Sequence, residues 1–500
     1  MRHNDTGFVK TLRGVALGSA LLASSGCMVG PKYRRPPAAA PAAYKEQPPA
    51  SFKEAGEWKP AQPNDGAIRG KWWEIYKDPV LNALEERVAI SNQNVLAAEA
   101  QYREAKTVVR IARAAYWPTG TTAPAVTSSR SPSSFTNNGQ VSQNAGARGF
   151  YNLPFALNYQ ADLWGSIRRT VNAATATAQA SEAQLENAKL TFQAELAQDY
   201  FELHGLDGGY RLLDNTVQSF EKYLVLTQNR YAGGIASQGD VALAETQLAT
   251  TKAQLVDIGV QRAQFEHAVA VLTGNPPSAL ALAAGPITIE PPPVPVGVPS
   301  DLLERRPDIA GFERQMAAAN EQIGIAQAAF YPALTLSAVF GFESADFGKW
   351  LTWPSRLWSV GPQMAETLFD AGRRHAVLDE TRAAYDVTVA NYRQTVLTAF
   401  QQVEDNLAAL RVLENEARAQ DDAVKAAERS LRITTDQYKG GIASYLQVIT
   451  TQSTALQNQI TAVNILTRRM TASVLLVEAL GGGWDASQLP TPKEVQAHGK

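Results

Sequence analysis

Histidine and cysteine are the first residues to weigh as candidates for chemistry, because imidazoles and thiolates serve as metal ligands, nucleophiles and acid–base groups. The chain has one cysteine, and its five histidines lie far apart, at His3, His204, His267, His375 and His498. No H-E-x-x-H arrangement occurs, and no second cysteine is present to complete a zinc site. A G-x-x-x-x-G-K-S/T phosphate loop is also absent, and no Ser/His/Asp or paired-carboxylate set stands out. The sequence therefore predicts no enzyme activity, no metal site and no cofactor.

The single cysteine, Cys27, lies at the end of an export-type segment. A basic start at residues 2–13 precedes the short apolar run 15–23, which is typical of a signal peptide and too short for a spanning helix. Without a partner the thiol forms no disulfide within the chain, and its surroundings resemble a bacterial lipobox, although Ser24 stands where Leu is usual. We therefore expect a signal peptide at 1–26 and lipidation (palmitate) of Cys27. The alternative is ordinary cleavage beside an incidental cysteine.

Charge and hydropathy argue against two further classes. The chain carries 46 Lys and Arg against 48 Asp and Glu, so it lacks the basic surface that nucleic-acid binding requires. Beyond residue 27 we find no run of 18 or more apolar residues, so we expect no membrane-spanning helix. If the chain crosses a bilayer, it must do so as a closed β-barrel, because a closed barrel satisfies every backbone polar group in lipid.

The chain is internally duplicated. AAYWP (114–118) is matched by AAFYP (328–332), and RYAGGIASQGD (230–240) is matched by QYKGGIASYLQ (437–447), which gives a repeat of about 200 residues. A Pro-rich stretch, 290–299, separates the two copies. We predict these segments: a Pro/Ala-rich leader at 27–66, a first repeat at 67–285, a connector at 286–300, a second repeat at 301–484 and a tail at 485–500.

Each repeat contains a region with the alternation of a β-strand. In FALNYQADL (155–163) and LTLSAVFGF (334–342) every second residue is apolar and most of the others are polar or small. Their partner strands are weaker in pattern. We predict four strands per chain, in two hairpins, at about 119–130, 150–164, 332–344 and 356–369.

A very long helical segment follows each strand region. Residues 166–230 and 371–437 are each expected to reach roughly 100 Å, and each ends at a Gly pair that lets the chain reverse. The returning helices, 238–273 and 445–479, are about half as long and carry heptad seams, which predict coiled-coil packing. A cytosolic coiled-coil rod explains these helices but not the signal peptide or the apolar strands.

Aromatic residues stand at all four helix–strand junctions. In transmembrane barrels such residues form girdles at the headgroup level, and a buried aromatic cluster under a soluble β-cap is the alternative. The residues concerned are Tyr116, Trp117, Trp164, Phe330, Tyr331 and Phe369. Four strands are too few to close a barrel, so chains must pool them: two copies give eight strands and three give twelve.

Six short segments of the mature chain are distinctive in sequence. They are CMVGPKYRRP (27–36), WWEIYKDPVLNAL (72–84), LTGNPP (272–277), DLLERRPDI (301–309), FYPALTLSA (330–338) and ALGGGW (479–484). In these segments the chain resembles the TolC-type outer-membrane factors, in particular the NodT-like lipoprotein branch that serves resistance-nodulation-division efflux systems. The resemblance covers essentially the whole mature chain.

This resemblance implies a mainly α fold with a β-barrel portion. In that fold a homotrimer forms a twelve-stranded barrel in the outer-membrane lipid, continued by a long periplasmic α-helical barrel with an equatorial domain. It also implies an inner-membrane pump and a periplasmic adaptor as partners. The expected function is a passive exit duct for small molecules such as drugs, toxic compounds or metal ions. The alternatives are a non-conducting structural lipoprotein of the outer membrane and the exit duct of a type I protein secretion system.

The resemblance also assigns residues at the two Gly-pair corners. The corners would form the periplasmic tip, where the channel narrows and the adaptor docks. The gate and lining positions fall on Leu446, Tyr445, Asp240, Thr450 and Gln447. The docking positions fall on Gly233, Gly234, Ser237, Gly440, Gly441 and Ser444. Thr450 stands where the family has an acidic residue, and Asp240 is also well placed to cap the returning helix.

Overall fold

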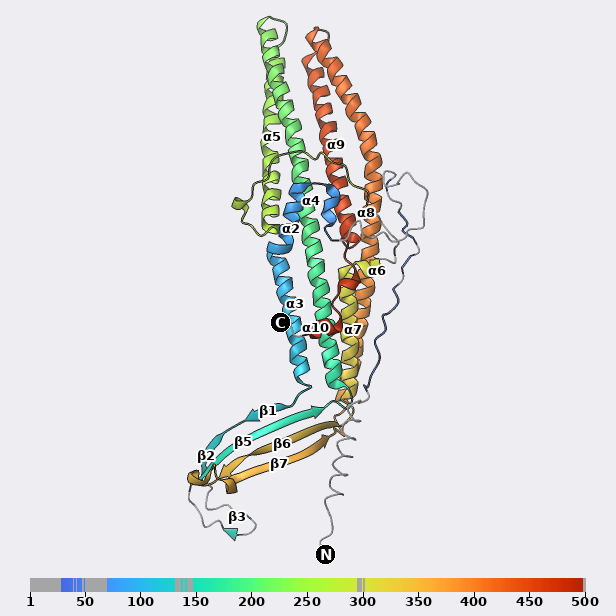
Figure 1. Cartoon of the computed structure of the whole chain (residues 1–500). Helices are drawn as coiled ribbons and strands as arrows, with labels where there is room; N and C mark the ends of the chain where they lie inside the picture. The colour runs from blue at the N-terminus through green and yellow to red at the C-terminus, as the bar shows by residue number, and fades with distance from the viewer. Residues whose placement is uncertain are drawn as a thin grey trace.

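The computed structural model describes residues 28–497 apart from 39, 42, 47, 48, 50–69, 131–135, 138, 139, 142–146, 295–298, 300 and 301. The chain is elongated, with a curved sheet at one end and long helices that run away from it (Figure 1). In chain order the described elements are η3 (Trp72–Tyr76), α2 (Pro79–Ser91), α3 (Gln93–Ala114), β1 (Thr119–Thr122), β2 (Ala125–Ser129), β3 (Thr136–Asn137), β4 (Gln140–Val141), β5 (Arg148–Ala161), α4 (Ser166–Ala232), α5 (Gln238–Leu272), η4 (Pro277–Ala279), α6 (Leu302–Arg305), α7 (Pro307–Ala328), β6 (Ala333–Ser344), η6 (Phe347–Lys349), η7 (Trp353–Ser355), β7 (Arg356–Ala365), α8 (Arg373–Lys439), α9 (Tyr445–Ala479), η8 (Ala486–Gln488) and α10 (Pro492–Gln496).

The sheet is antiparallel and has the order β1-β5-β6-β7, with β2 also paired to β5. The predicted strand at about 119–130 is thus two strands, and Pro124 lies in the gap between them, where it has no backbone N–H to donate. The central pairing joins β5 of the first repeat to β6 of the second, from Tyr151 opposite Ser344 to Ala161 opposite Leu334. The two hairpins therefore form one sheet, which the sequence pattern did not specify.

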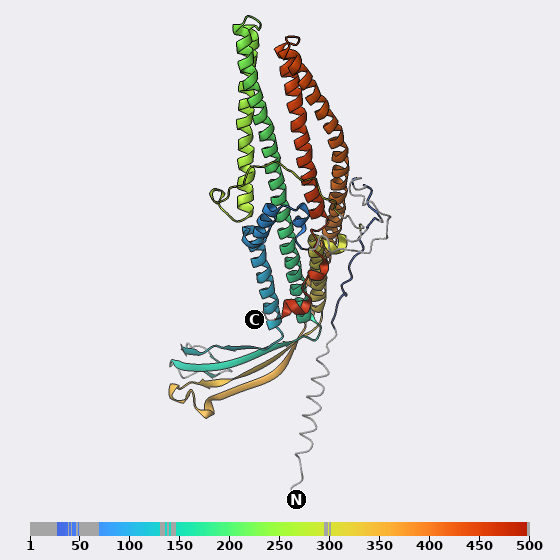
Figure 2. The same cartoon turned by 45° about the horizontal axis from the view of Figure 1, so that its top comes forward.

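The two long helices have the predicted length. α4 and α8 each contain 67 residues, which corresponds to roughly 100 Å. α5 and α9 each contain 35 residues and return along α4 and α8. The α4–α5 pair and the α8–α9 pair run to neighbouring corners at the end far from the sheet, as the turned view shows (Figure 2).

The helical region before the first strand is broken at Asn92. Its side-chain oxygen accepts hydrogen bonds from the backbone amides of Asn94 (2.9 Å) and Val95 (3.2 Å), so it caps α3. Its side-chain nitrogen donates to the Leu272 carbonyl at the end of α5, at 2.9 Å. The break therefore lets α2 and α3 change direction where the returning helix stops.

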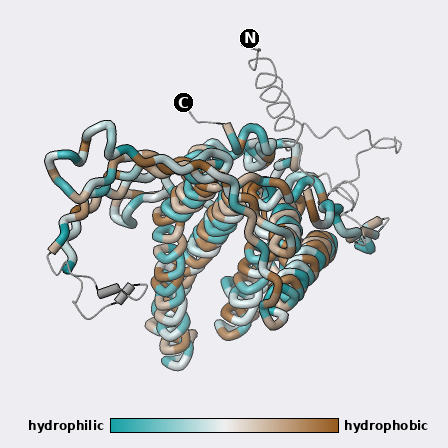
Figure 3. Tube along the Cα trace, turned by 90° about the horizontal axis from the view of Figure 1, so that it is seen from below, coloured by the Kyte–Doolittle hydropathy of each residue, from teal (hydrophilic) through white to brown (hydrophobic). Residues whose placement is uncertain are grey.

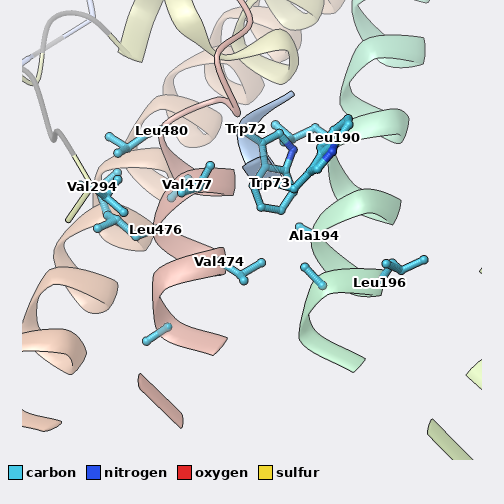
Figure 4. Packing of buried hydrophobic residues seen from close by; sticks show 14 of the residues in the cluster. Trp72, Trp73, Leu190, Ala194, Leu196, Val294, Val474, Leu476, Val477 and Leu480 are labelled. Carbon is cyan, nitrogen blue, oxygen red and sulfur yellow. The ribbon is translucent and has the colours of Figure 1, made fainter. Parts of the chain in front are cut away.

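The main core lies at mid-length, where η3 and α2 pack with the middle of α4 and the end of α9. Figure 4 shows Trp72 and Trp73 between Leu190 of α4 and the α9 side chains Val474 and Val477. The Tyr76 hydroxyl lies 2.9 Å from the Ser473 hydroxyl inside this core. Elsewhere apolar and polar residues alternate along the helices instead of forming one continuous apolar belt (Figure 3).

One helix in the described part of the chain, α9, is long and apolar enough to span a membrane by length and composition. Thr and Gln residues interrupt its apolar residues, so α9 contains no strictly apolar run of 18 residues. Met470, Val474 and Leu476 of α9 are buried in the main core. α9 is therefore a packed core helix.

The buried carboxyl group of Glu85 on α2 is expected to make the stability of the protein depend on pH. Its side chain is fully buried, neither carboxylate oxygen has a hydrogen-bond partner within the described chain, and burial raises its pKa well above the ordinary 4.5. Ionisation therefore opposes folding. The contribution of Glu85 to the free energy of unfolding is most favourable below about pH 4.5 and falls as the pH rises toward the folded-state pKa.

We expect Glu85→Gln to remove this decline, because the amide does not titrate. Thermal unfolding of wild type and Glu85→Gln from about pH 4 to pH 8 measures the decline. Stability falls with rising pH over the range in which Glu85 is protonated in the folded state but not in the unfolded state. The exposed Glu86→Gln is the matched control. Equal slopes for wild type and Glu85→Gln would contradict the prediction.

Candidate channel tip and membrane-facing sheet

The two Gly-pair corners have the same backbone geometry. Gly234 and Gly441 have φ of +73° and +78°, the left-handed region that glycine adopts without strain. Ile235 N–H donates to the Arg230 carbonyl and Ile442 N–H to the Gln437 carbonyl, each at 2.8 Å. These bonds are the Schellman pattern that ends a helix. Gly233 and Gly440 lie just before, with φ of −82° and −74°, and all four glycines are exposed.

Both returning helices begin with a reciprocal capping box. Asp240 accepts hydrogen bonds from the Ser237 amide (2.9 Å) and hydroxyl (2.8 Å), and its own amide donates to the Ser237 hydroxyl. Gln447 accepts from the Ser444 amide at 2.9 Å, and its amide donates back to the Ser444 hydroxyl at 3.4 Å. Asp240 and Gln447 thus do the same structural work, although only the aspartate carries charge.

Tyr445 requires a correction. Its side chain is 2 % exposed and packs inside the chain with Tyr438, at 5.7 Å between ring centroids, and with Val448 and Ile449. Burial raises its pKa to about 12, and its hydroxyl has no hydrogen-bond partner within the described residues. The prediction that Tyr445 lines a channel is therefore wrong for this structure. Successive residues of an α-helix point about 100° apart, so Tyr445 points toward the neighbouring helix pair while Leu446 points away from it.

Leu446 and Thr450 face outward, one helical turn apart. Leu446 is 59 % exposed, and the exposed Thr450 uses its hydroxyl to donate to the Leu446 carbonyl at 2.8 Å. The threonine hydroxyl is therefore hydrogen-bonded within its own helix. The exposed surface at these two positions carries no charge.

A cluster of contacts joins the two helix pairs near the corners. We call it the tip clamp: Tyr223, Thr227 and Arg230 of α4 with Thr435 and Tyr438 of α8. Arg230 donates to the Tyr438 carbonyl at 2.7 Å and lies 4.5 Å above the Tyr438 ring centroid. The Tyr438 hydroxyl lies 3.1 Å from the Thr227 hydroxyl, and that of Tyr223 lies 3.2 Å from that of Thr435. The clamp was not identified from sequence, although Arg230 and Tyr438 both stand in the duplicated corner motif.

The sheet has one apolar and one polar face, as the alternation predicts. Phe155, Phe340 and Trp358 are register partners across β5, β6 and β7, and Phe155 stacks on Phe340 with centroids 5.5 Å apart. On the other face, Gln160 pairs with Thr335 and Thr335 with Gln363. The apolar face is largely uncovered, with Trp358 at 75 % exposure. This exposure argues against a soluble β-cap over a buried aromatic cluster.

The predicted girdle residues lie where the sheet meets the helices. Trp164 stacks on Tyr331 at 4.7 Å and donates its indole N–H to the Pro332 carbonyl at 2.8 Å. Phe330 packs edge-on against His375, whereas Trp117 and Phe369 are strongly exposed and Tyr116 moderately so. Trp117 precedes β1 and Phe369 follows β7, the two edge strands of the sheet.

A second aromatic group at the far end of the sheet was missed. Tyr151 contacts Phe347 and Trp350 at 5.5 and 5.6 Å between centroids, and Arg356 lies over the exposed Trp353. Three aromatics within the short stretch 347–353 are the signal that would have found it. The sheet is thus bordered by aromatic residues at both ends, as expected where a strand crosses both headgroup regions.

No group of three or more His, Asp or Glu side chains among the described residues is placed to hold a metal ion. The predicted signal peptide and Cys27 lie outside the described residues.

Comparison with known families agrees with this geometry. A family model described as outer membrane efflux protein matches residues 84–275 and 298–482. The chain belongs to the outer membrane efflux protein family. It is accordingly a protein of the bacterial outer membrane that extends into the periplasm and acts as an exit duct in efflux.

Relatives of the chain cover nearly its full length. A probable efflux pump outer membrane protein, TtgC of Pseudomonas putida, is 30% identical over 478 residues, or 95% of this chain and 96% of the relative. The pyoverdine export outer membrane protein OpmQ of Pseudomonas aeruginosa is 29% identical over 85% of this chain and 90% of its own. The solved structure of the outer-membrane channel OprN superposes with a TM-score of 0.82 at 26% identity, covering 92% of this chain and all of the other.

Proposed function

We propose that three copies of this chain form a continuous passive duct from the periplasm to the outside. The observation that carries the proposal is the sheet. It has four strand positions, an uncovered apolar face and two edge strands, β1 and β7, that are each paired on one side only, and it continues into helices of roughly 100 Å. Lipid is the environment that an uncovered apolar face of this kind requires.

The edge strands supply the means of closure. β1 and β7 lie at opposite ends of the sheet order, so β7 of one copy can pair with β1 of the next. Edge strands left open in lipid would expose unpaired backbone groups, which cost several kcal/mol each. Three copies give twelve strands, within the range of known closed barrels. The helices of all copies would then form a ring on the periplasmic side.

The partners follow from the absence of an energy-transducing motif. The duct itself supplies no work, so an energised inner-membrane pump and a periplasmic adaptor are proposed as its partners. The adaptor would dock at the exposed corners formed by Gly234 with Ser237 and by Gly441 with Ser444. We further propose lipidation at Cys27 and keep the two-repeat division at 67–285 and 301–484.

Small molecules are the proposed cargo. One relative is named for efflux and another for export of pyoverdine, a small molecule, which favours this reading over protein secretion. The outward-facing Leu446 and Thr450 would form the narrowest uncharged ring, so selectivity would lie mainly in the pump.

Removal of the Leu446 side chain tests the duct and its gate together. We expect wild-type trimers in a planar bilayer to conduct weakly. Leu446→Ala should conduct more, because each copy loses an exposed apolar group at the constriction. The matched control is Ile235→Ala, which removes an exposed aliphatic side chain from the other corner and should leave conductance near wild type.

Two outcomes would contradict the proposal. Silence of both wild type and Leu446→Ala as intact trimers would exclude a duct gated at this position. A heat-labile monomer without the gel migration of a barrel would instead favour a non-conducting structural lipoprotein.

A further inference from the structure

The first described residues lie at the junction between the sheet and the helices. The Val29 amide donates to the Trp164 carbonyl at 3.1 Å, directly after β5. Met28 packs on Gly165, where an added Cβ would stand 2.7 Å from the Met28 Cγ. The backbone that follows Cys27 is therefore placed beside the Trp164–Tyr331 stack.

A buried arginine holds this backbone. Arg169 of α4 is 1 % exposed, and its Nε donates to the Val29 carbonyl at 2.6 Å while one terminal nitrogen donates to the Pro31 carbonyl at 3.3 Å. Its other terminal nitrogen pairs with Glu321 of α7 at 2.9 Å. A buried guanidinium is tolerated only when it is paired and hydrogen-bonded, and here two of its partners are backbone carbonyls of the N-terminal segment.

Space for the arginine comes from a glycine on the facing helix. A Cβ at Gly324 of α7 would lie 2.2 Å from the Arg169 Nε, and a Cβ at Gly30 would lie 2.7 Å from the Gly324 Cα. Gly30 itself has φ of +109°, which side chains rarely adopt. The Arg169 groove, formed by Arg169, Glu321 and Gly324, is thus shaped to residues 28–31.

Further contacts continue the segment along α7 and α8. The Tyr33 hydroxyl donates to the Glu313 carboxylate at 2.7 Å, and Arg35 donates to the Tyr392 hydroxyl at 3.0 Å. Glu404 accepts from the backbone amides of Lys45 and Glu46 at 2.7 and 2.8 Å. The described part of the leader is therefore bound to the helices by several specific side chains.

We propose that the Arg169 groove is a docking site for the mature N-terminus that fixes where the lipid on Cys27 enters the membrane. The proposal rests on the lipidation proposed above. Cys27 directly precedes Met28, and consecutive Cα atoms lie about 3.8 Å apart, so the acylated residue is that close to Met28. Its acyl chains therefore enter lipid at the level of the Trp164–Tyr331 stack, next to the sheet. Arg169 is a positioning residue in this account, and the same contacts join α4 of the first repeat to α7 of the second.

Spin labelling tests the docking, and the native sequence makes it clean. Cys27 is the only cysteine, and acylation blocks its thiol. The substitution Lys32→Cys therefore introduces a single reactive thiol at an exposed position of the N-terminal segment. The variants Arg169→Ala and Gly324→Ala are made in this background, with the exposed Arg382→Ala of α8 as control. Each acylated trimer is reconstituted in phospholipid vesicles, and the mobility of the label and its access to lipid-soluble and water-soluble relaxers are measured.

We expect an immobile label at one depth in the parent and in Arg382→Ala. Arg169→Ala and Gly324→Ala should show a mobile label, and trypsin should release the acylated N-terminal peptide at least about tenfold faster because local protection is lost. Gly324→Ala leaves Arg169 in the chain but fills the space that its side chain occupies. Arg169→Lys retains the positive charge but cannot bond Val29, Pro31 and Glu321 together, so its label mobility should be intermediate. Gel migration as a trimer shows that each variant is folded.

Two results would overturn the docking proposal. One is a mobile label in the parent protein. The other is an unchanged label and unchanged trypsin release in folded Arg169→Ala and Gly324→Ala. An N-terminal peptide of unmodified mass would instead refute lipidation at Cys27. This outcome is distinct from failure of the docking proposal, because the label on Lys32→Cys can also be read in a protein that carries Cys27→Ser.

Discussion

Replacement of Arg230 by alanine is expected to open the channel at its periplasmic tip. Arg230 of α4 makes two of the tip-clamp contacts to α8, a hydrogen bond of 2.7 Å to the Tyr438 carbonyl and a ring contact of 4.5 Å. A hydrogen bond to a charged donor contributes about 1.5–3 kcal/mol where buried, and the partial exposure of Arg230 reduces this toward about 1 kcal/mol per copy. Three copies acting on one opening would shift the closed–open equilibrium by about a hundredfold, since each 1.4 kcal/mol is a factor of ten.

Single-channel recording checks this prediction. Arg230→Ala should raise the open probability at neutral pH. Lys439→Ala is the matched control, because Lys439 is a basic residue at the other corner whose carboxylate contact, Asp436 at 4.0 Å, lies on its own helix. An Arg230→Ala channel as closed as Lys439→Ala would show that the apolar cluster around Tyr438 and Tyr445 holds the helix pairs together without the arginine.

Substitution of Gly205 by leucine is expected to have the largest effect on assembly. Gly205 lies inside α4, where glycine costs about 1 kcal/mol relative to alanine, so its presence calls for a packing reason. A Cβ there would stand 2.3 Å from the Thr467 hydroxyl of α9. α4 and α9 therefore approach too closely at this point for any side chain, and a leucine must push them apart. Overpacking of this kind costs typically about 1–3 kcal/mol and more when backbones must move.

The experiment compares Gly205→Leu with Gly259→Ala. Gly259 of α5 has nothing within 4 Å of its added Cβ, so alanine should be tolerated and should stabilise the helix by up to about 1 kcal/mol. Heat stability of the trimer on gels and the yield in the outer membrane are the readouts. A Gly205→Leu trimer as stable as wild type would mean that α4 and α9 separate without loss.

The sequence by itself determined the features that depend on local backbone chemistry. The Gly pairs predicted two helix ends near Arg230 and Gln437, and the structure has Schellman turns there. The reason is local, because glycine adopts the left-handed backbone conformation without strain. Period-two alternation in 155–163 and 334–342 predicted one apolar sheet face, since successive strand residues point to opposite sides. The family resemblance carried the expectation of an outer-membrane efflux duct, and the family comparison confirmed that expectation.

Only the tertiary structure decided which face of each helix meets which neighbour. Tyr445 and Leu446 are adjacent in sequence, yet one is buried between the helix pairs and the other faces outward. Asp240 and Gln447 differ in charge, yet both side chains cap their helices in the same way. Arg169 gave no signal at all, because its partners lie far along the chain at Val29 and Glu321. Long-range packing fixes these positions, and a helix whose faces are all partly polar does not encode its own orientation.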